Sequence, residues 1–142
     1  MTTTNGAAPI KTEGLTKHYG DVKALVDLDL EVEQGEVFGF LGPNGAGKTT
    51  TMRILAGFLP ATSGRAEVAG LDVLRESLEV RRRIGYLPES VPLYRELRVR
   101  EMLTFQARLH GMTRADWKRR IPAVLERVGI VDRIERPIAH LS

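Results

Sequence analysis

A glycine-rich segment that ends in lysine and threonine carries the clearest chemistry in this 142-residue sequence. Its residues are Gly42, Pro43, Asn44, Gly45, Ala46, Gly47, Lys48 and Thr49. They match the pattern Gly-x-x-x-x-Gly-Lys-Ser/Thr, in which the glycines let successive backbone N–H groups turn inward around an anion. The lysine adds a positive charge for the outer phosphates of a nucleotide, and the threonine hydroxyl is a ligand for Mg²⁺. The sequence therefore predicts a site for a nucleoside triphosphate with Mg²⁺.

The residues on both sides of this glycine loop support that prediction. Residues 36–41 form a short apolar run that is typical of a buried parallel strand, and residues 49–56 are predicted to be helical. Strand, glycine loop and helix are the context that the phosphate-binding motif requires. Unpaired N–H groups at the helix start add to the attraction for phosphate, and Thr50 can contribute a hydroxyl or N–H contact. A turn without a ligand would explain the glycines but not Lys48 beside Thr49.

The composition is typical of a globular cytoplasmic domain. Hydrophobic residues make up 42% of the sequence and charged residues 27%, and the absence of cysteine excludes disulfides and thiolate metal sites. No apolar run approaches the roughly 20 residues that span a bilayer. Residues 1–9 are small and polar and lack the apolar stretch of a signal peptide, so we predict a disordered tail there.

The charges are unevenly distributed along the chain. Residues 1–80 carry 7 Lys and Arg against 11 Asp and Glu, whereas residues 81–142 carry 14 against 7. A basic half can bind nucleic acid or an anionic membrane, but such charges more often form a solvated helical face. Trp117 is the one aromatic residue interleaved with the basic residues of 114–120, which argues against a nucleic-acid partner.

The predicted elements place the glycine loop in an α/β domain. Strands are expected at residues 10–15, 24–33, 36–41, 65–69 and 84–87. Residues 24–33 alternate apolar and acidic side chains, which is typical of a half-exposed antiparallel strand. Tyr19 lies in a predicted turn over residues 17–21, and residues 74–83 are predicted to be helical.

The last third of the sequence changes from strands to helices, and the first of these is predicted over residues 99–110. Thr113 and Asp116 have the spacing of a helix N-cap, which indicates that a second helix begins there. Pro122 predicts a kink, or a new helix start, near Arg120. Helices are expected to end at Gly57, Gly111 and Gly129.

With these features in order, the chain resembles the nucleotide-binding subunit of an ATP-binding cassette (ABC) transporter. The resemblance covers nearly all of the sequence after the tail, and it implies ATP and Mg²⁺ as cofactors. It also implies an α/β fold of the P-loop NTPase type, with an ABC-type core, an antiparallel β subdomain and a helical subdomain. The expected domains are a tail at 1–9, the nucleotide-binding core at 10–88, and the Q-loop with the helical subdomain at 89–142.

The resemblance assigns roles to two residues outside the glycine loop. Tyr19, which precedes Gly20, is at the position of the family's aromatic residue that stacks on adenine; the alternative is a partly buried structural tyrosine. Glu89 is at the position where most members have a glutamine that reaches Mg²⁺ and the attacking water. A carboxylate can also ligate Mg²⁺, and the pair Pro88-Glu89 resembles an exporter branch that includes multidrug-type subunits. The alternative for Glu89 is a carboxylate in solvent.

Leu141-Ser142 resembles the first two residues of the family signature Leu-Ser-Gly-Gly-Gln. In the family, the Walker B aspartate, the glutamate that polarises water and a late histidine all follow that signature. We therefore expect the sequence to be part of a longer gene product, with no catalytic residue among these 142. We also expect an open apolar sheet edge beside residues 36–41 and, as a consequence, poor solubility or order.

The resemblance implies an energy-coupling subunit of a transporter, which hydrolyses ATP when complete and is peripheral on the cytoplasmic face of the cell membrane. Its implied partners are transmembrane permease subunits and a second nucleotide-binding subunit. Leu93, Tyr94 and Phe105 are expected to contact the membrane subunits, although core packing is favoured for Phe105. Two alternatives remain: an ABC-type ATPase acting on nucleic acid or ribosomes, and a non-catalytic ATP-binding fragment.

Overall fold

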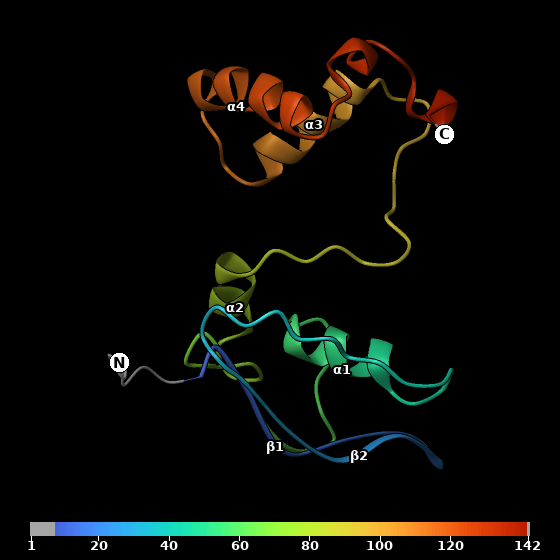
Figure 1. Cartoon of the computed structure of the whole chain (residues 1–142), viewed down its shortest axis with the longest axis vertical. Coiled ribbons are helices and arrows are strands. Elements are labelled where there is room, and N and C mark those ends of the chain that lie inside the picture. Colours follow the sequence, from blue (N-terminus) through green and yellow to red (C-terminus); the bar gives the residue numbers. More distant parts are fainter. Residues whose placement is uncertain (1–7, 142) are drawn as a thin grey trace. The chain divides into compact units, whose positions relative to one another are not determined.

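A long antiparallel hairpin opens the described part of the chain, which is residues 8–141 of this computed structural model (Figure 1). β1 (Ile10–Tyr19) pairs with β2 (Val22–Val32), and β1 also pairs with β3 (Ser63–Val68). The two-residue β4 (Leu71–Asp72) completes a sheet in the order β2-β1-β3-β4, in which all neighbours are antiparallel. The predicted tail at residues 1–9 lies mostly outside the described residues.

The hairpin confirms the predicted strands but shortens the predicted turn. β1 continues to Tyr19, which is paired with Val22, so only Gly20 and Asp21 form the turn that was expected over 17–21. The correction arises because pairing with β2 satisfies the backbone of residues 17–19. In β2 the apolar residues from Leu28 onward alternate with exposed acidic residues, as predicted.

Helix α1 (Lys48–Leu55) packs on this sheet (Figure 1). Both belong to the first unit of the chain, which ends at Tyr86. The apolar face of α1 joins a cluster made of Leu15, Leu25, Ile54, Leu55, Ala66, Val68, Val73 and Val80. Ile54 is 2% exposed, so the helix that follows the glycine loop is anchored by burial rather than by the loop itself.

Two predicted strands are not formed in this structure. Within residues 8–141, the segments 36–41 and 84–87 have no strand partner and run as irregular chain. An apolar segment becomes a strand only where a neighbouring strand accepts and donates its backbone hydrogen bonds. Val37 is therefore 99% exposed and Leu41 91% exposed, which leaves apolar surface open beside the glycine loop.

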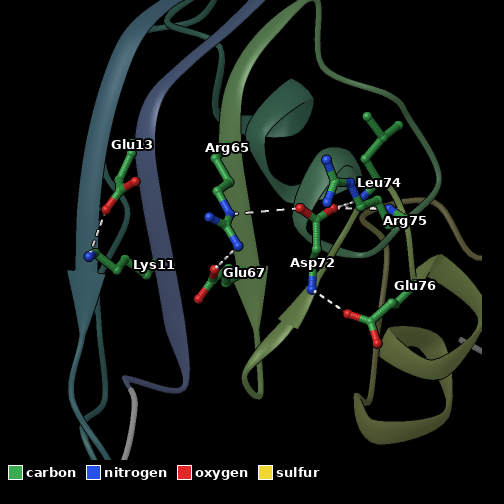
Figure 2. A network of polar contacts seen from close by, with 8 residues as sticks. All are labelled: Lys11, Glu13, Arg65, Glu67, Asp72, Leu74, Arg75 and Glu76. Carbon is green, nitrogen blue, oxygen red and sulfur yellow. Dashed lines mark hydrogen bonds and ion pairs between the residues drawn. The ribbon is translucent and has the colours of Figure 1, made fainter.

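Asp72 controls where the second helix of this unit begins (Figure 2). Its Oδ1 accepts hydrogen bonds from the N–H groups of Leu74 and Arg75, both at 3.0 Å, and its own N–H donates to Glu76 Oε2 at 3.0 Å. These bonds hold residues 72–76 in a turn. Helix α2 (Ser77–Arg83) therefore begins three residues later than the sequence predicts.

Several ion pairs lie on the solvent face of the sheet (Figure 2). Lys11 Nζ lies 2.7 Å from Glu13 Oε1, and Arg65 lies 2.7 Å from Glu67 and 3.7 Å from Asp72. The hydrogen bond and charge of Lys11 lower the pKa of Glu13, and the same contact raises the pKa of Lys11. Because Lys11 and Glu13 are exposed, their pair contributes little to the folding free energy.

The second unit, which begins at Leu87, is helical. It contains α3 (Val99–Leu109), α4 (Arg114–Arg127) and two short 3₁₀ turns, η1 (Val131–Arg133) and η2 (Ile138–His140). The apolar cluster of this unit consists of Val99, Met102, Ile121, Leu125 and Ile138. None of the helices within residues 8–141 is long and apolar enough to cross a bilayer.

Helix α4 confirms its predicted start, and of the two predicted effects of Pro122 it excludes a new helix start. Thr113 Oγ1 accepts a hydrogen bond from the N–H of Asp116 at 3.2 Å, as an N-cap residue does. The helix then continues through Pro122, and no new helix begins near Arg120. Proline removes one backbone hydrogen bond, but Ile121 and Leu125 are buried on either side of it, and their burial offsets that loss.

The chain leaves α1, α3 and α4 in the same way, through a glycine in the left-handed conformation. At the end of α4, Gly129 has φ 70°; its N–H donates to the carbonyl of Glu126, and the N–H of Ile130 donates to that of Leu125. This is the Schellman arrangement, which satisfies carbonyls that the helix leaves free. Gly57 and Gly111 repeat it, so all three predicted helix ends are confirmed.

We expect Gly129→Ala to lower the free energy of unfolding of the helical unit by about 1 kcal/mol, because alanine is strained at positive φ. No atom lies within 4 Å of a Cβ added at Gly129, so the effect isolates backbone strain from steric overlap. Urea unfolding followed through Trp117, the single tryptophan, measures it. Gly129→Asn is the matched control and should lose less, since asparagine tolerates this conformation; equal losses would contradict the explanation.

Candidate nucleotide-binding site

The glycine loop ends where α1 begins, at Gly47. Gly47 is the N-cap residue of α1, with φ 82°, and it has no side chain to cap the first N–H groups of the helix. The N–H of Thr51 donates to the Gly47 carbonyl at 2.8 Å, and Thr51 Oγ1 donates to the same oxygen at 3.0 Å. The first turn of α1 contains no acidic residue. Its N–H groups and positive dipole end therefore suit an anion.

Gly47 also lies against the sheet. A Cβ placed on it would lie 2.5 Å from the carbonyl oxygen of Ala24 and 3.3 Å from the side chain of Leu25, both in β2. This close approach requires glycine, independently of any phosphate. Neither Ala24 nor Thr51 belongs to the glycine motif. The contact between Ala24 and Gly47 joins residues far apart in the sequence, so no sequence pattern predicts it. Thr51, however, has the i, i+4 spacing from Gly47 that allows a hydroxyl to bond to a helix carbonyl.

Lys48 extends its side chain back along the loop. Its Nζ donates to the carbonyl oxygen of Gly42 at 2.5 Å and to that of Pro43 at 2.7 Å, while the N–H of Ala46 donates to the Pro43 carbonyl at 3.2 Å. Among residues 8–141, no carboxylate forms an ion pair with Lys48. The ammonium is held in the loop by neutral oxygens, so its positive charge stays uncompensated.

The three threonines after Lys48 differ in their exposure to solvent. Thr51 is fully buried, Thr50 is half-buried and Thr49 is exposed. The hydroxyl of Thr49 is thus the accessible one, as a ligand for a hard cation must be. Donors on the loop, an uncompensated ammonium and an exposed hydroxyl together fit the triphosphate and Mg²⁺ that the motif predicts.

Tyr19 lies at the tip of the hairpin, and its side chain is half exposed. Lys17 Nζ lies 5.3 Å from the ring centroid and donates to the Pro60 carbonyl at 2.8 Å, so one ring face lies under a cation. Tyr19 pairs with Val22, two residues before Ala24, whose carbonyl meets Gly47. The hairpin tip with Tyr19 and the C-terminal end of the glycine loop are therefore neighbours in the first unit.

Glu89 is the one predicted site residue outside the first unit. It lies in the second unit, in an irregular segment, and its side chain is exposed. Thr49, the other predicted metal ligand, is in the first unit. Within residues 8–141, no group of three or more His, Cys, Asp and Glu side chains could hold a metal ion. The structure thus places Tyr19 on the hairpin whose residue Ala24 contacts the glycine loop, but it gives no contact that assigns Tyr19 or Glu89 to this site.

Residues 25–142 match the family described as ABC transporter. The sequence is 44% identical over 133 residues to the daunorubicin resistance ATP-binding protein DrrA3 of Streptomyces coeruleorubidus, and 41% identical over 133 residues to the bacitracin transport ATP-binding protein BcrA of Bacillus licheniformis. It is 36% identical over 135 residues to the Nod factor export ATP-binding protein I of Cupriavidus pinatubonensis. These alignments cover 94%, 94% and 95% of this chain but 42% of each relative, so the chain spans less than half their length.

A solved structure, described as that of the ATP binding subunit of an ABC transporter, resembles this chain with a TM-score of 0.78. The two sequences are 30% identical, and the match covers 94% of this chain and 55% of the other. The likeness therefore extends over nearly all of the present chain and about half of the solved one.

We expect Gly47→Ala to destabilise the first unit by about 2 kcal/mol, because the added methyl group meets the Ala24 carbonyl and the residue keeps a positive φ. Thermal or urea unfolding followed by circular dichroism measures the loss. Gly39→Ala is the matched control: Gly39 has no positive φ and no atom within 4 Å of its Cβ position, so stability should change by less than about 0.5 kcal/mol. Similar losses in both variants would contradict the role of the contact.

Proposed function

The chain belongs to the ABC transporter family, and we propose that it is the nucleotide-binding part of a transporter's energy-coupling subunit, with residues 42–49 as its ATP site. Family membership also establishes the α/β, P-loop fold with its antiparallel β subdomain and helical subdomain. The observation that carries the proposal for the site is the Lys48 ammonium, which two carbonyls hold inside the loop and which pairs with no carboxylate in the described part of the chain.

The loop's own residues account for recognition of a triphosphate. Phosphate oxygens are charged acceptors and compete well with the neutral carbonyls of Gly42 and Pro43 for the Lys48 ammonium. The backbone N–H groups of residues 44–47 and of the first turn of α1 donate to the same oxygens, with Thr50 beside the inner phosphates. Bound Mg²⁺ would offset phosphate charge, with the exposed hydroxyl of Thr49 as one ligand.

Two further residues complete the proposed site. Tyr19, at the neighbouring hairpin tip, offers the ring face away from Lys17 to adenine. Glu89 is proposed as a Mg²⁺ ligand and as the residue that couples the site to a membrane partner. That proposal rests on its place in the family pattern, with Glu where most members have Gln, and on the affinity of carboxylates for Mg²⁺.

We further propose that the whole protein hydrolyses ATP and drives export. The direction is supported by the name of one relative, the Nod factor export ATP-binding protein I. The other two relatives are named for bacitracin transport and daunorubicin resistance. Transmembrane permease subunits and a second nucleotide-binding subunit are the proposed partners, at the inner face of the cell membrane. Residues 10–88 are proposed as the nucleotide-binding core, and residues 89–142 as the Q-loop and helical subdomain. Leu93, Tyr94 and Phe105 are proposed contacts for the membrane subunits.

Lys48→Ala should weaken binding of ATP by at least about tenfold, because it removes the charge-assisted contacts to phosphate. Isothermal titration of the 142-residue chain with ATP and Mg²⁺ measures the affinity. Lys118→Ala is the matched control, since Lys118 is an exposed lysine of α4 outside the glycine loop and the hairpin, and its affinity should equal that of the unmodified chain. Unchanged affinity in Lys48→Ala would refute the assignment of the site.

Tyr19→Ala should weaken ATP binding by about 5-fold to 150-fold, which corresponds to the 1–3 kcal/mol that one base stacked on an aromatic ring contributes. Tyr19→Phe keeps the ring and should retain most of the affinity. Inorganic triphosphate has no base, so neither substitution should alter its binding if the loop is intact. A parallel loss for triphosphate in Tyr19→Ala would show that the tyrosine supports the loop rather than adenine.

A further inference from the structure

A groove of about 480 Å³ lies between α3 and α4 in the second unit. It is lined by Leu103, Gln106, Ala107, His110, Met112, Trp117, Arg120, Ile121 and Val124. The α3 residues are spaced i, i+3 and i+4, and the α4 residues i, i+3, i+4 and i+7, so each helix contributes one face. The groove shares no residue with the glycine loop or with the predicted contacts at Leu93, Tyr94 and Phe105.

The groove has an apolar floor and a basic rim. Leu103, Ala107, Ile121 and Val124 supply aliphatic surface, and the half-buried Trp117 adds an aromatic one. The polar lining residues are Gln106, His110 and Arg120, and no acidic residue lines the groove. An apolar pocket with a few convergent polar groups is the usual form of a site for a small organic ligand, and its volume falls in the usual range.

Arg120 is the charge in this groove that lacks a counter-ion. Among residues 8–141 it forms no ion pair, whereas its neighbour Arg119 pairs with Asp116 at 3.7 Å. The Asp116 carboxylate, four residues before Arg120, accepts a hydrogen bond from Thr113 Oγ1 at 2.5 Å and is paired with Arg119. It lines an adjoining hollow with Arg119 and Arg120 but does not line this groove. A ligand's anionic group would therefore find a free guanidinium at the rim.

We propose that the α3–α4 groove binds an amphipathic organic anion, with its apolar body on the aliphatic floor against Trp117 and its carboxylate or sulfonate at Arg120. Charge complementarity selects this class. An organic cation would meet Arg120 without a compensating carboxylate, and a small inorganic anion would leave the apolar floor without a partner. The groove shares no residue with the proposed ATP site, so it offers the helical unit a way to sense a metabolite or a transported compound directly.

Decanoate is a suitable probe, because it joins a flexible apolar chain to one carboxylate, and Trp117 is the single tryptophan of the chain. Titration should change the Trp117 emission saturably with one site per chain. Decanol, which has the same chain length without the charge, should bind about tenfold more weakly. Decyltrimethylammonium should not saturate the site. Equal binding of decanoate and decanol would overturn the proposal, because the basic rim would then play no part.

Matched arginine variants test the position of the anion. Arg120→Gln should weaken decanoate binding about tenfold and bring it to the level of decanol, whereas Arg119→Gln should leave it unchanged. Far-ultraviolet circular dichroism shows whether each variant keeps its helices. Val124→Glu places a negative charge at the 40% exposed Val124 and should also weaken decanoate. Equal effects of the two arginine variants would overturn the proposal. So would sedimentation showing a dimer that decanoate dissociates, since the groove would then be a contact between copies.

Discussion

The close approach of Gly47 to the Ala24 carbonyl is the constraint on which the arrangement of the site depends. It sets the glycine loop directly on β2, at the point where Leu25 enters the core. From there α1 runs with Ile54 and Leu55 buried, and it packs against β2 and β3, so the sheet fixes the position of the loop through the loop's C-terminal end. The N-terminal end of the loop has no such support, because residues 36–41 pair with no strand among residues 8–141. The anchored end of the loop is therefore the end that is proposed to bind the anion, where Lys48 and Thr49 lie.

The features that the sequence predicts well are those set by local chemistry. Alternation in β2, the cap at Thr113 and the glycines that end α1, α3 and α4 each depend on a few consecutive residues, and all are present as expected. Pro122 shows the limit of such signals: its local cost is real, but burial of Ile121 and Leu125 outweighs it and the helix continues. Propensity decides an outcome only where tertiary packing does not oppose it.

Long-range contacts explain what could not be predicted. The apolar runs at residues 36–41 and 84–87 have the composition of buried strands, but a strand exists only with a partner, and composition does not supply one. Likewise, Tyr19 was predicted to lie in a turn, but pairing across the hairpin makes it the last residue of β1. In the candidate site, the motif identified every residue of the loop, whereas the Ala24 contact is visible only in the structure. The role of Glu89 stays a prediction from the family pattern, because no contact in the described residues tests it.

The two units therefore hold their chemistry in different ways. In the first unit, loop carbonyls hold the Lys48 ammonium, and among the residues that the structure describes no carboxylate neutralises it. In the second unit, the helices follow from short-range sequence features. Glu135 forms ion pairs with Arg98 and Arg100, which link the C-terminal part of this unit to the start of α3. With those two arginines paired and Arg119 held by Asp116, Arg120 is left free above an apolar floor. In both units the proposed anion site rests on a basic side chain that is positioned by neighbours that do not cancel its charge.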